Sequence, residues 1–489
     1  MRYIRDDHWE RLPTIRIHKA VLKNFKSVKY GEVIMDCSKQ FVPYNTTSDV
    51  LGIYGQNGSG KTAFIEALSI LKSLLSGERV SFLYSDCIAV DADHAELEFT
   101  FDLQYPTEPL SIRKVVYSFC LSVYDADELN ENEREMAEAF DGLFSKQVIK
   151  RRVRVYNEVI KVSGEIDGSL KKLMPIIDTS TEKTAFGPAT KRKLFYPINK
   201  ENDVKLLVNK QLASERSTSF IFVDDTLELF AKQEEYSAYN EILLEMHHFG
   251  EHYLAVVDTK SMAAIRSNVI LPLFTLDAWS DVMVNTVGSN VVSERMLKAL
   301  HNVVDPVGEV LPQFVPGMSI AIEELGPTML DNGTEGKSIE LVVHRGEKKL
   351  PIRCESDGVR KIISVMSLII RAYNQHSTTI AIDELDAGIF EYLLGEILQI
   401  FAESGKGQLI FTSHNLRPLE VLDKRFICFT TTNPENRYIH MKNVGASNNL
   451  RSLYFREIQM NEQDEEVYKA TKKHKIIAAL RKAGFDGKA

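Results

Sequence analysis

The most constraining feature of the chain is a short apolar run that ends in a glycine-rich loop, residues 51–62 (LGIYGQNGSGKT). The loop fits the pattern G-x-x-x-x-G-K-[ST] at four positions, which are Gly55, Gly60, Lys61 and Thr62. In such a loop the backbone N–H groups turn inward around phosphates, the lysine reaches the β- and γ-phosphates, and the threonine can ligate Mg²⁺. Residues 63–75 continue at helical spacing, so the phosphates would lie at a helix N-terminus. The pattern predicts a strand, a phosphate-binding loop and a helix.

A second apolar run, residues 377–382, ends in Asp383 and Glu384. This is the arrangement of a buried parallel strand that delivers acidic groups to its C-terminal edge. Asp383 is predicted to hold the Mg²⁺ shell, and Glu384 to orient or deprotonate the water that attacks the γ-phosphate. An Asp-Glu pair after an apolar strand is also a common start of a helix, so this pattern alone leaves both interpretations open.

Two further patterns point to the same chemistry. Residues 408–415 predict another buried strand that ends in His414, a position where a γ-phosphate sensor is expected, although a strand-end histidine is usually structural. Residues 359–373 predict a helix with one core-facing side. Its N-terminus would present the Ser356 hydroxyl and the bare N–H groups around Gly358, which form a natural anion site.

The remaining sequence predicts α/β organisation in several lobes, since 489 residues exceed the usual size of one domain. Residues 14–36 have the pattern of a β-hairpin, and residues 95–103, 112–123 and 153–162 alternate like strands of a flanking antiparallel sheet. Residues 125–138 are acidic and helix-prone, typical of an exposed face. We expect a first half of the nucleotide-binding head in residues 1–125, strands and then a mostly helical insertion or oligomerisation domain in 126–310, the second half of the head in 311–446, and a helical tail in 447–489.

Composition limits the partners. The formal net charge of −9 argues against sequence-independent coating of DNA. A basic cluster at residues 191–193, with Phe186, Phe195 and Tyr196 nearby, is a candidate contact for nucleic acid, but a solvated loop is favoured. The five cysteines are far apart and include no C-x-x-C pair, and the chain has neither a signal-peptide pattern nor an apolar window long enough for a membrane span. These features predict a cytoplasmic protein with reduced thiols and no membrane partner.

Taken in order, the motifs resemble those of the ABC-type ATPase superfamily, in the branch of SMC, RecF and OLD-like heads also called AAA15 or AAA21 ATPases. The SDGVRK sequence departs from the LSGGQ of transporters, which disfavours a transporter subunit, and the Q-loop has no firm position, with Gln104 as its candidate. The resemblance covers roughly residues 14–105 and 315–445. The matching segments are residues 22–28 (LKNFKSV) for the N-terminal strand signature, 55–62 for Walker A, 356–361 (SDGVRK) for the signature motif, 380–384 for Walker B, 385–388 for the D-loop and 412–414 for the switch histidine.

The resemblance implies an α/β fold: an ABC-type ATPase head with a mixed central sheet that carries the P-loop, an antiparallel β-subdomain and a largely helical inserted domain. It also implies ATP and Mg²⁺, and a head-to-head dimer or higher oligomer in which Ser356 and Gly358 of one subunit close on the γ-phosphate held by Lys61 of the other. The expected catalytic residues are Glu384, His414 and Lys61, and the expected metal ligands are Thr62 and Asp383. The expected nucleotide-binding residues are Gly55, Asn57, Gly58, Ser59, Gly60, Lys61, Thr62, Ala63, Ser356, Gly358 and Arg360.

OLD nucleases of this branch carry a Toprim nuclease domain after the switch histidine, whereas only about seventy-five residues follow His414 here, so we expect any nuclease to be a separate protein. This organisation resembles the ATPase subunits of bacterial anti-phage systems such as PARIS, Septu and two-gene abortive-infection loci. The first hypothesis is therefore a sensor or scaffold ATPase that oligomerises and controls a separate effector. The second is a RecF-like or SMC-like DNA-repair ATPase, and the third is an assembly scaffold that binds nucleotide with negligible hydrolysis. In the DNA-repair hypothesis, the DNA backbone would be contacted by residues 191–193 and by the basic tail, which contains Lys472, Lys473, Lys475, Arg481 and Lys482.

Overall fold

The computed structural model describes residues 12–35, 48–107, 112–125, 151–166, 168–233, 237–259, 270–273, 282–330, 333–441, 449–460, 464–469 and 471–485. The acidic stretch predicted at residues 125–138 lies outside these ranges except for Asp125. Among the described helices, none combines the length and apolar character needed to cross a bilayer.

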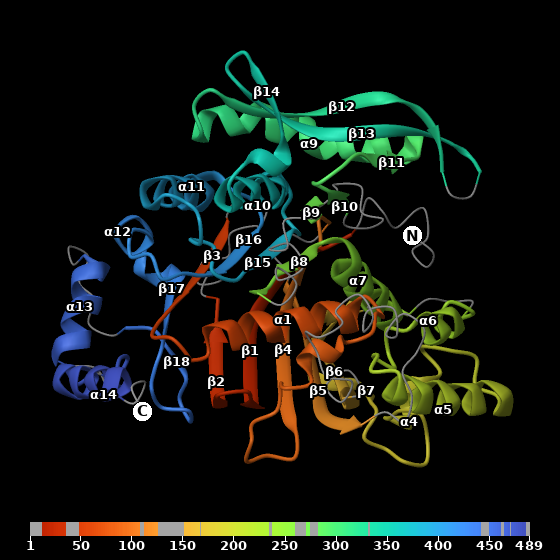
Figure 1. The fold of residues 1–489 in the computed structure, drawn as a ribbon. Helices are drawn as coiled ribbons and strands as arrows, with labels where there is room; N and C mark the ends of the chain where they lie inside the picture. The colour runs from red at the N-terminus through yellow and green to blue at the C-terminus, as the bar shows by residue number, and fades with distance from the viewer. Residues whose placement is uncertain are drawn as a thin grey trace.

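The central sheet has six strands in the order β18-β17-β3-β16-β15-β8 (Figure 1). Every side chain of β3, β15 and β16 is buried, as expected of parallel strands covered on both faces. All neighbouring pairs are parallel except β17 with β18, so β3, β15 and β16 end at the same edge of the sheet. The strands are β3 (Asp49–Tyr54), β8 (Leu254–Val257), β15 (Thr379–Ile382), β16 (Gln408–Thr412), β17 (Ile427–Thr430) and β18 (Tyr438–Ile439).

A second, antiparallel sheet of six strands has the order β2-β1-β4-β5-β6-β7. The hairpin and the three alternating strands predicted from the sequence are confirmed here. Together the two sheets confirm the predicted fold class, a mixed sheet with the phosphate loop beside an antiparallel β-subdomain. The strands are β1 (Thr14–Phe25), β2 (Val28–Ile34), β4 (Ala95–Gln104), β5 (Ile112–Asp125), β6 (Arg151–Ile166) and β7 (Ser169–Asp178).

Helix α1 (Lys61–Leu75) lies between the two sheets and contacts strands of both (Figure 1). Twelve of its fifteen residues are buried, including the acidic Glu66, and α7 (Ala238–His252) packs beside it. A helix that is apolar nearly all round belongs in the interior. Lys26, in the turn between β1 and β2, forms an ion pair with Glu66 and so compensates the buried charge.

The other face of the central sheet carries α10 (Asp357–Asn374), with α9 (Glu294–Phe314) packed against it and a small sheet beyond (Figure 1). The predicted helix at 359–373 is thus confirmed, and Ser293 caps α9 by accepting a hydrogen bond from the Met296 N–H. The other elements of this side are α11 (Glu391–Ser404), α12 (Pro418–Val421), β9 (Ile270–Leu273), β10 (Val282–Asn285), β11 (Asn290–Val292), β12 (Met318–Met329), β13 (Glu335–Arg345) and β14 (Lys348–Pro351).

A small helical lobe follows β7, and its core is aromatic. Phe186 and Phe195 lie edge to face at 5.8 Å, and Tyr196 stacks on Phe230 at 6.4 Å. All four rings are buried. These aromatic residues therefore pack inside the lobe and are not available to stack with nucleic-acid bases beside the basic cluster. The helices of the lobe are α4 (Ala189–Arg192), α5 (Lys200–Glu215) and α6 (Asp224–Phe230).

The structure differs from the sequence prediction in how the segment predicted as an insertion is used. β7 extends the antiparallel sheet, and β8 pairs with β15 in the central sheet. β8 has no separate signal in the sequence, because its four apolar residues follow α7 almost directly and a short apolar run cannot be distinguished from a helix by periodicity. The chain ends in α13 (Leu450–Met460) and α14 (Lys473–Phe485), and the described 3₁₀ turns are η3 (Phe82–Tyr84), η4 (Ile352–Cys354) and η5 (Lys424–Phe426).

Two buried polar contacts join the sheets at the edge opposite the phosphate loop. Arg16 of β1 donates to Asp49 of β3 at 2.7 Å, with side chains 1% and 5% exposed. The Gln408 side chain accepts from the Ile17 N–H at 3.1 Å and donates to the Ile17 carbonyl at 2.8 Å. Ile17 lies next to the irregularity where the β1–β4 register shifts, and Gln408 gives both of its backbone polar groups a partner.

We predict that Arg16→Met lowers the free energy of unfolding by about 3–5 kcal/mol, because it leaves the Asp49 carboxylate buried without its cation. Adding Asp49→Leu should restore a large part of the loss, since no buried charge then remains. Urea unfolding of both variants measures this. If Arg16→Met lowers the unfolding free energy by less than about 1 kcal/mol, the value typical of exposed ion pairs, Arg16 is not needed to compensate the buried Asp49 charge.

Candidate nucleotide site

The phosphate loop connects β3 to α1 and depends on glycine at two positions in particular. A Cβ on Gly55 (φ 153°) would lie 1.8 Å from Thr430 Oγ1, so only glycine fits against the neighbouring strand. Gly60 adopts a left-handed conformation (φ 98°) at the N-cap of α1, and no side chain caps the helix there. The first N–H groups of α1 therefore face the loop, as an anion site requires.

Lys61 is the first residue of α1 and is 6% exposed. Its Nζ donates to the carbonyls of Gly55 at 2.9 Å and Gln56 at 3.1 Å. Burial lowers the pKa of Lys61, and the nearby carboxylates of Asp383, Glu384 and Asp386 counteract this effect. The ammonium group is thus held over the loop, opposite the acidic groups of the Walker B region.

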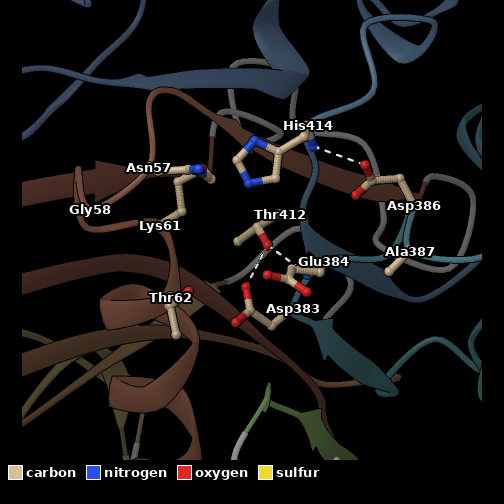
Figure 2. Close-up of a pocket in the computed structure, with 10 residues that line it drawn as sticks. All are labelled: Asn57, Gly58, Lys61, Thr62, Asp383, Glu384, Asp386, Ala387, Thr412 and His414. Carbon is tan, nitrogen blue, oxygen red and sulfur yellow. Dashed lines mark hydrogen bonds between the residues drawn. The ribbon is translucent and has the colours of Figure 1, made fainter. Parts of the chain in front are cut away.

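Thr412, at the end of β16, organises the two carboxylates at the end of β15. Its hydroxyl donates to Asp383 Oδ1 at 2.5 Å and accepts from the Glu384 N–H at 2.8 Å (Figure 2). Glu384 has a left-handed backbone conformation (φ 49°), which is uncommon for a residue other than glycine and points to a functional constraint. The sequence places Thr412 only in the switch segment and carries no signal for this contact.

Asp383 fits the role of a magnesium ligand. The residue is 3% exposed, and its Oδ2 has no hydrogen-bond partner within the described part of the chain. Burial raises the pKa of Asp383, whereas the hydroxyls of Thr412 and Thr62 lower it, so Thr62 lies close to the carboxylate. An unpartnered buried carboxylate oxygen beside a threonine hydroxyl is the type of donor set that Mg²⁺ takes from a protein in phosphate-transfer sites.

The loop after Glu384 is tied to the loop after β16. Asp386 Oδ2 accepts from the backbone N–H groups of His414 and Asn415, each at 3.1 Å. The His414 side chain is exposed, and its ring extends over the cavity toward the phosphate loop (Figure 2). The D-loop carboxylate therefore holds the backbone of the predicted switch histidine.

These groups surround one cavity of about 500 Å³. Of the residues predicted from the sequence, Asn57, Gly58, Lys61, Thr62, Asp383, Glu384 and His414 line the cavity. Three more lining residues, Asp386, Ala387 and Thr412, complete it (Figure 2). The other predicted loop residues, Gly55, Ser59, Gly60 and Ala63, belong to the loop and the start of α1 but do not line the cavity.

The predicted signature residues lie outside this cavity. Ser356 is the N-cap of α10 and accepts from the Val359 N–H at 3.4 Å, and Arg360 forms an ion pair with Asp357. A Cβ on Gly358 would lie 2.5 Å from the Gly388 carbonyl oxygen. The start of α10 therefore packs directly on the D-loop of the same chain, which gives Gly358 a structural reason to be glycine.

Two other connections were not visible in the sequence. Lys361 Nζ donates to the Glu384 carbonyl, which links α10 to the Walker B turn. Asp258, 1% exposed at the end of β8, accepts from Ser69 of α1 at 2.8 Å and from Tyr84, and its charge raises the pKa of Asp383. The Q-loop candidate Gln104 instead pairs with Thr14 and Ile112 in the antiparallel sheet and does not line the cavity.

We predict that Thr412→Val, which keeps the shape of the side chain but removes the hydroxyl, lowers the unfolding free energy by about 1.5–3 kcal/mol. It should also raise the pKa of Asp383 further, because a hydroxyl that lowers it is lost. Since Mg²⁺ needs the ionised carboxylate, Mg²⁺-dependent nucleotide binding should then fail at a higher pH than in the wild type when the pH is lowered.

Thr379→Val is the matched control, since the Thr379 hydroxyl is equally buried and donates to Gln408 at the opposite end of the sheet. Binding of a fluorescent ATP analogue across a pH series measures the effect. If the two variants lose nucleotide binding at the same pH, the role assigned to Thr412 in keeping Asp383 ionised is contradicted.

We predict that Gly358→Ala costs about 1–3 kcal/mol of unfolding free energy through overpacking against the D-loop. Gly288→Ala is the control, because a Cβ there meets no atom of the described residues within 4 Å. Urea unfolding compares the two. Equal stabilities would mean that the close approach of Gly358 and Gly388 is not a constraint.

Comparison with solved structures finds similarity over most of the chain at low identity. An SMC head bound to the C-terminal winged-helix domain of ScpA matches with 12% identity over 87% of this chain and 97% of that one, at a TM-score of 0.41. The SMC head domain of Thermotoga maritima matches with 13% identity, 87% and 99% coverage and a TM-score of 0.35. The recombination mediator RecF matches with 13% identity over 88% of this chain and 99% of that one, at a TM-score of 0.34. These values are too low to carry function from those proteins to this chain.

No curated protein sequence matches the chain. A family of AAA domains, described as "AAA domain, putative AbiEii toxin, Type IV TA system", matches residues 50–420, which include the phosphate loop, both carboxylates and His414. The match covers well over half of the sequence. The chain therefore belongs to this AAA-domain family of P-loop ATPases.

Proposed function

We propose that the chain binds ATP with Mg²⁺ in the 500 Å³ cavity, hydrolyses it, and uses the cycle as a conformational switch. The observation that best supports this is the meeting of Lys61 and Thr62 with Asp383, Glu384 and His414 around one cavity, although they come from three separate parts of the sequence. Cation, hydroxyl, carboxylates and imidazole form the set that phosphoryl transfer to water needs.

Each group has a defined task in this proposal. Lys61 and the N–H groups at the start of α1 bind the phosphates, while Thr62 and Asp383 hold Mg²⁺. The metal, when bound, neutralises charge on the phosphate oxygens. Glu384 orients the attacking water and accepts its proton, and His414 senses the γ-phosphate.

A second copy of the chain completes the site in this proposal. The N-terminus of α10 exposes Ser356 and Asp357, and neither lines the cavity of its own chain. In a head-to-head dimer, Ser356 and Gly358 would close on the phosphates bound by the partner copy. Because Gly358 packs on the D-loop of its own chain, closure would act directly on the loop that carries Asp386.

For the cellular role, we propose a sensor or scaffold ATPase of a two-component anti-phage system that controls a separate effector. The family description, which refers to a putative AbiEii toxin and a type IV toxin–antitoxin system, supports a role of this kind. The alternative is a DNA-repair ATPase acting on DNA. The burial of Phe186, Phe195 and Tyr196 removes the stacking platform that would have favoured a nucleic-acid contact beside residues 191–193.

We predict that Lys61→Ala abolishes tight nucleotide binding, whereas Glu384→Gln keeps binding but lowers the hydrolysis rate by about 10²–10⁴-fold, as expected for loss of a general base. Glu384→Gln should also accumulate the ATP-bound dimer. Phosphate release and light-scattering mass, measured with and without the protein encoded by the neighbouring gene, test both points.

Lys72→Ala, in the last turn of α1, and Glu396→Gln, on the exposed side of α11, are the matched controls because neither residue lines the cavity. Co-assembly with the neighbour that depends on Lys61 and Glu384 supports the defence role. If only DNA stimulates ATP hydrolysis, and the stimulation depends steeply on salt, the DNA-repair role replaces the defence role. Wild-type hydrolysis in Glu384→Gln would contradict the catalytic assignment.

A further inference from the structure

The C-terminal segment returns to the phosphate loop. The backbone N–H of Lys469 donates to the side-chain oxygen Oε1 of Gln56 at 2.8 Å, and these residues are 413 positions apart in the sequence. Two residues earlier, Val467 is 1% exposed and packs in the core with α13 and the central sheet. Residues 464–469, which we call the C-terminal strap, are therefore seated on the ATPase head next to the nucleotide site.

The strap is held by a second set of contacts to the turn between β17 and β18. The Thr432 N–H donates to the Glu466 carbonyl at 2.7 Å, and the Thr432 hydroxyl donates to the Glu466 carboxylate at 2.9 Å. The amide of Asn433 donates to the Glu465 carboxylate at 3.0 and 3.2 Å. The two strands joined by this turn, β17 and β18, also contact the phosphate loop.

One hydroxyl group from each of β17 and β18 makes the contact to the phosphate loop. The Thr430 hydroxyl, at the end of β17, shares a hydrogen bond with the Ser59 hydroxyl, and the Tyr438 hydroxyl, in β18, donates to the Gly60 carbonyl at 2.8 Å. The strap, the β17–β18 turn and the phosphate loop are thus one connected hydrogen-bonded unit. The loop is therefore linked to the strap by two sets of hydrogen bonds, one through Gln56 and one through the turn.

Gln56 is the residue that joins phosphate binding to the strap. Its backbone carbonyl accepts from Lys61 Nζ at 3.1 Å, while its side chain accepts from the Lys469 N–H. In the proposed function Lys61 binds the phosphates of ATP, and each phosphate contact competes with the bond from Lys61 to this carbonyl. We infer that Gln56 is a positioning residue that couples nucleotide binding to release of the C-terminal strap. This inference rests on the proposed function of the cavity.

The strap precedes α14 in the chain, and we expect it to determine how well α14 is ordered. All residues of α14 whose side chains the structure describes are exposed, and three of them are large and apolar: Ile476, Ile477 and Leu480 are 47%, 41% and 69% exposed. A helix of 13 residues is marginally stable on its own in water. Its order, and its resistance to protease at Lys472, Lys473 and Lys475, therefore depend on the strap that anchors it.

The test compares two substitutions at one position. Lys469→Pro removes the N–H that donates to Gln56, whereas Lys469→Ala keeps it, and both remove the same tryptic site. Without nucleotide, trypsin should remove the tail of Lys469→Pro about fivefold faster than that of Lys469→Ala, the factor expected for one hydrogen bond. A non-hydrolysable ATP analogue with Mg²⁺ should accelerate cleavage of Lys469→Ala and leave Lys469→Pro unchanged.

Gln56→Leu and Gln56→Glu repeat the test from the other side of the bond. Gln56→Leu should behave like Lys469→Pro, and Gln56→Glu should retain protection without nucleotide because a carboxylate oxygen still accepts from the Lys469 N–H. Binding of a fluorescent ATP analogue is measured in parallel. If Lys469→Ala binds the analogue normally but its cleavage does not respond to nucleotide, this inference alone is overturned. If the wild-type protein does not bind the analogue, the proposed function is overturned and this inference with it.

Discussion

The structure depends on the parallel alignment of β3, β16 and β15, because this alignment brings the phosphate loop, Thr412 and the two carboxylates to one edge of one sheet. The alignment is completed by the Thr412 hydroxyl, which donates to Asp383 and accepts from the Glu384 N–H. One side chain thus fixes both acidic groups relative to the strand that leads to His414. The cavity is then a consequence of sheet geometry, and its groups need no long flexible segments to meet.

The same site carries energetic costs that the rest of the fold must offset. Asp383 is buried with an oxygen that has no partner among the described residues, Glu384 has a left-handed backbone conformation, and Lys61 is almost fully buried. Burial disfavours the charged forms of Asp383 and Lys61, which is why their pKa values move in opposite directions. The apolar packing of α1 between the two sheets and the ion pair of Lys26 with Glu66 are stabilising contacts close to the strained region. These costs are accepted where the chemistry requires them.

The motifs with short, local chemistry could be predicted from the sequence, namely the phosphate loop, Asp383 with Glu384, the hairpin in β1 and β2, and the long amphipathic helices. The contacts that could not be predicted join distant segments and leave no periodic pattern. β8 is only four residues long and follows a helix, so its place beside β15 depends on tertiary packing. The close approach of Gly358 to Gly388, the contacts of Asp258 with α1 and the bond between Gln56 and the C-terminal strap are likewise properties of the folded chain.

The central claim is that the cavity between the phosphate loop and the Walker B carboxylates holds ATP and Mg²⁺. A crystal structure of the protein with Mg²⁺ and a non-hydrolysable ATP analogue tests it most directly. We expect the β- and γ-phosphates against Lys61 and the start of α1, with the metal bound by Thr62 and Asp383 at about 2.1 Å. A nucleotide bound elsewhere, or phosphates in this cavity with Asp383 turned away from the metal, would contradict the account.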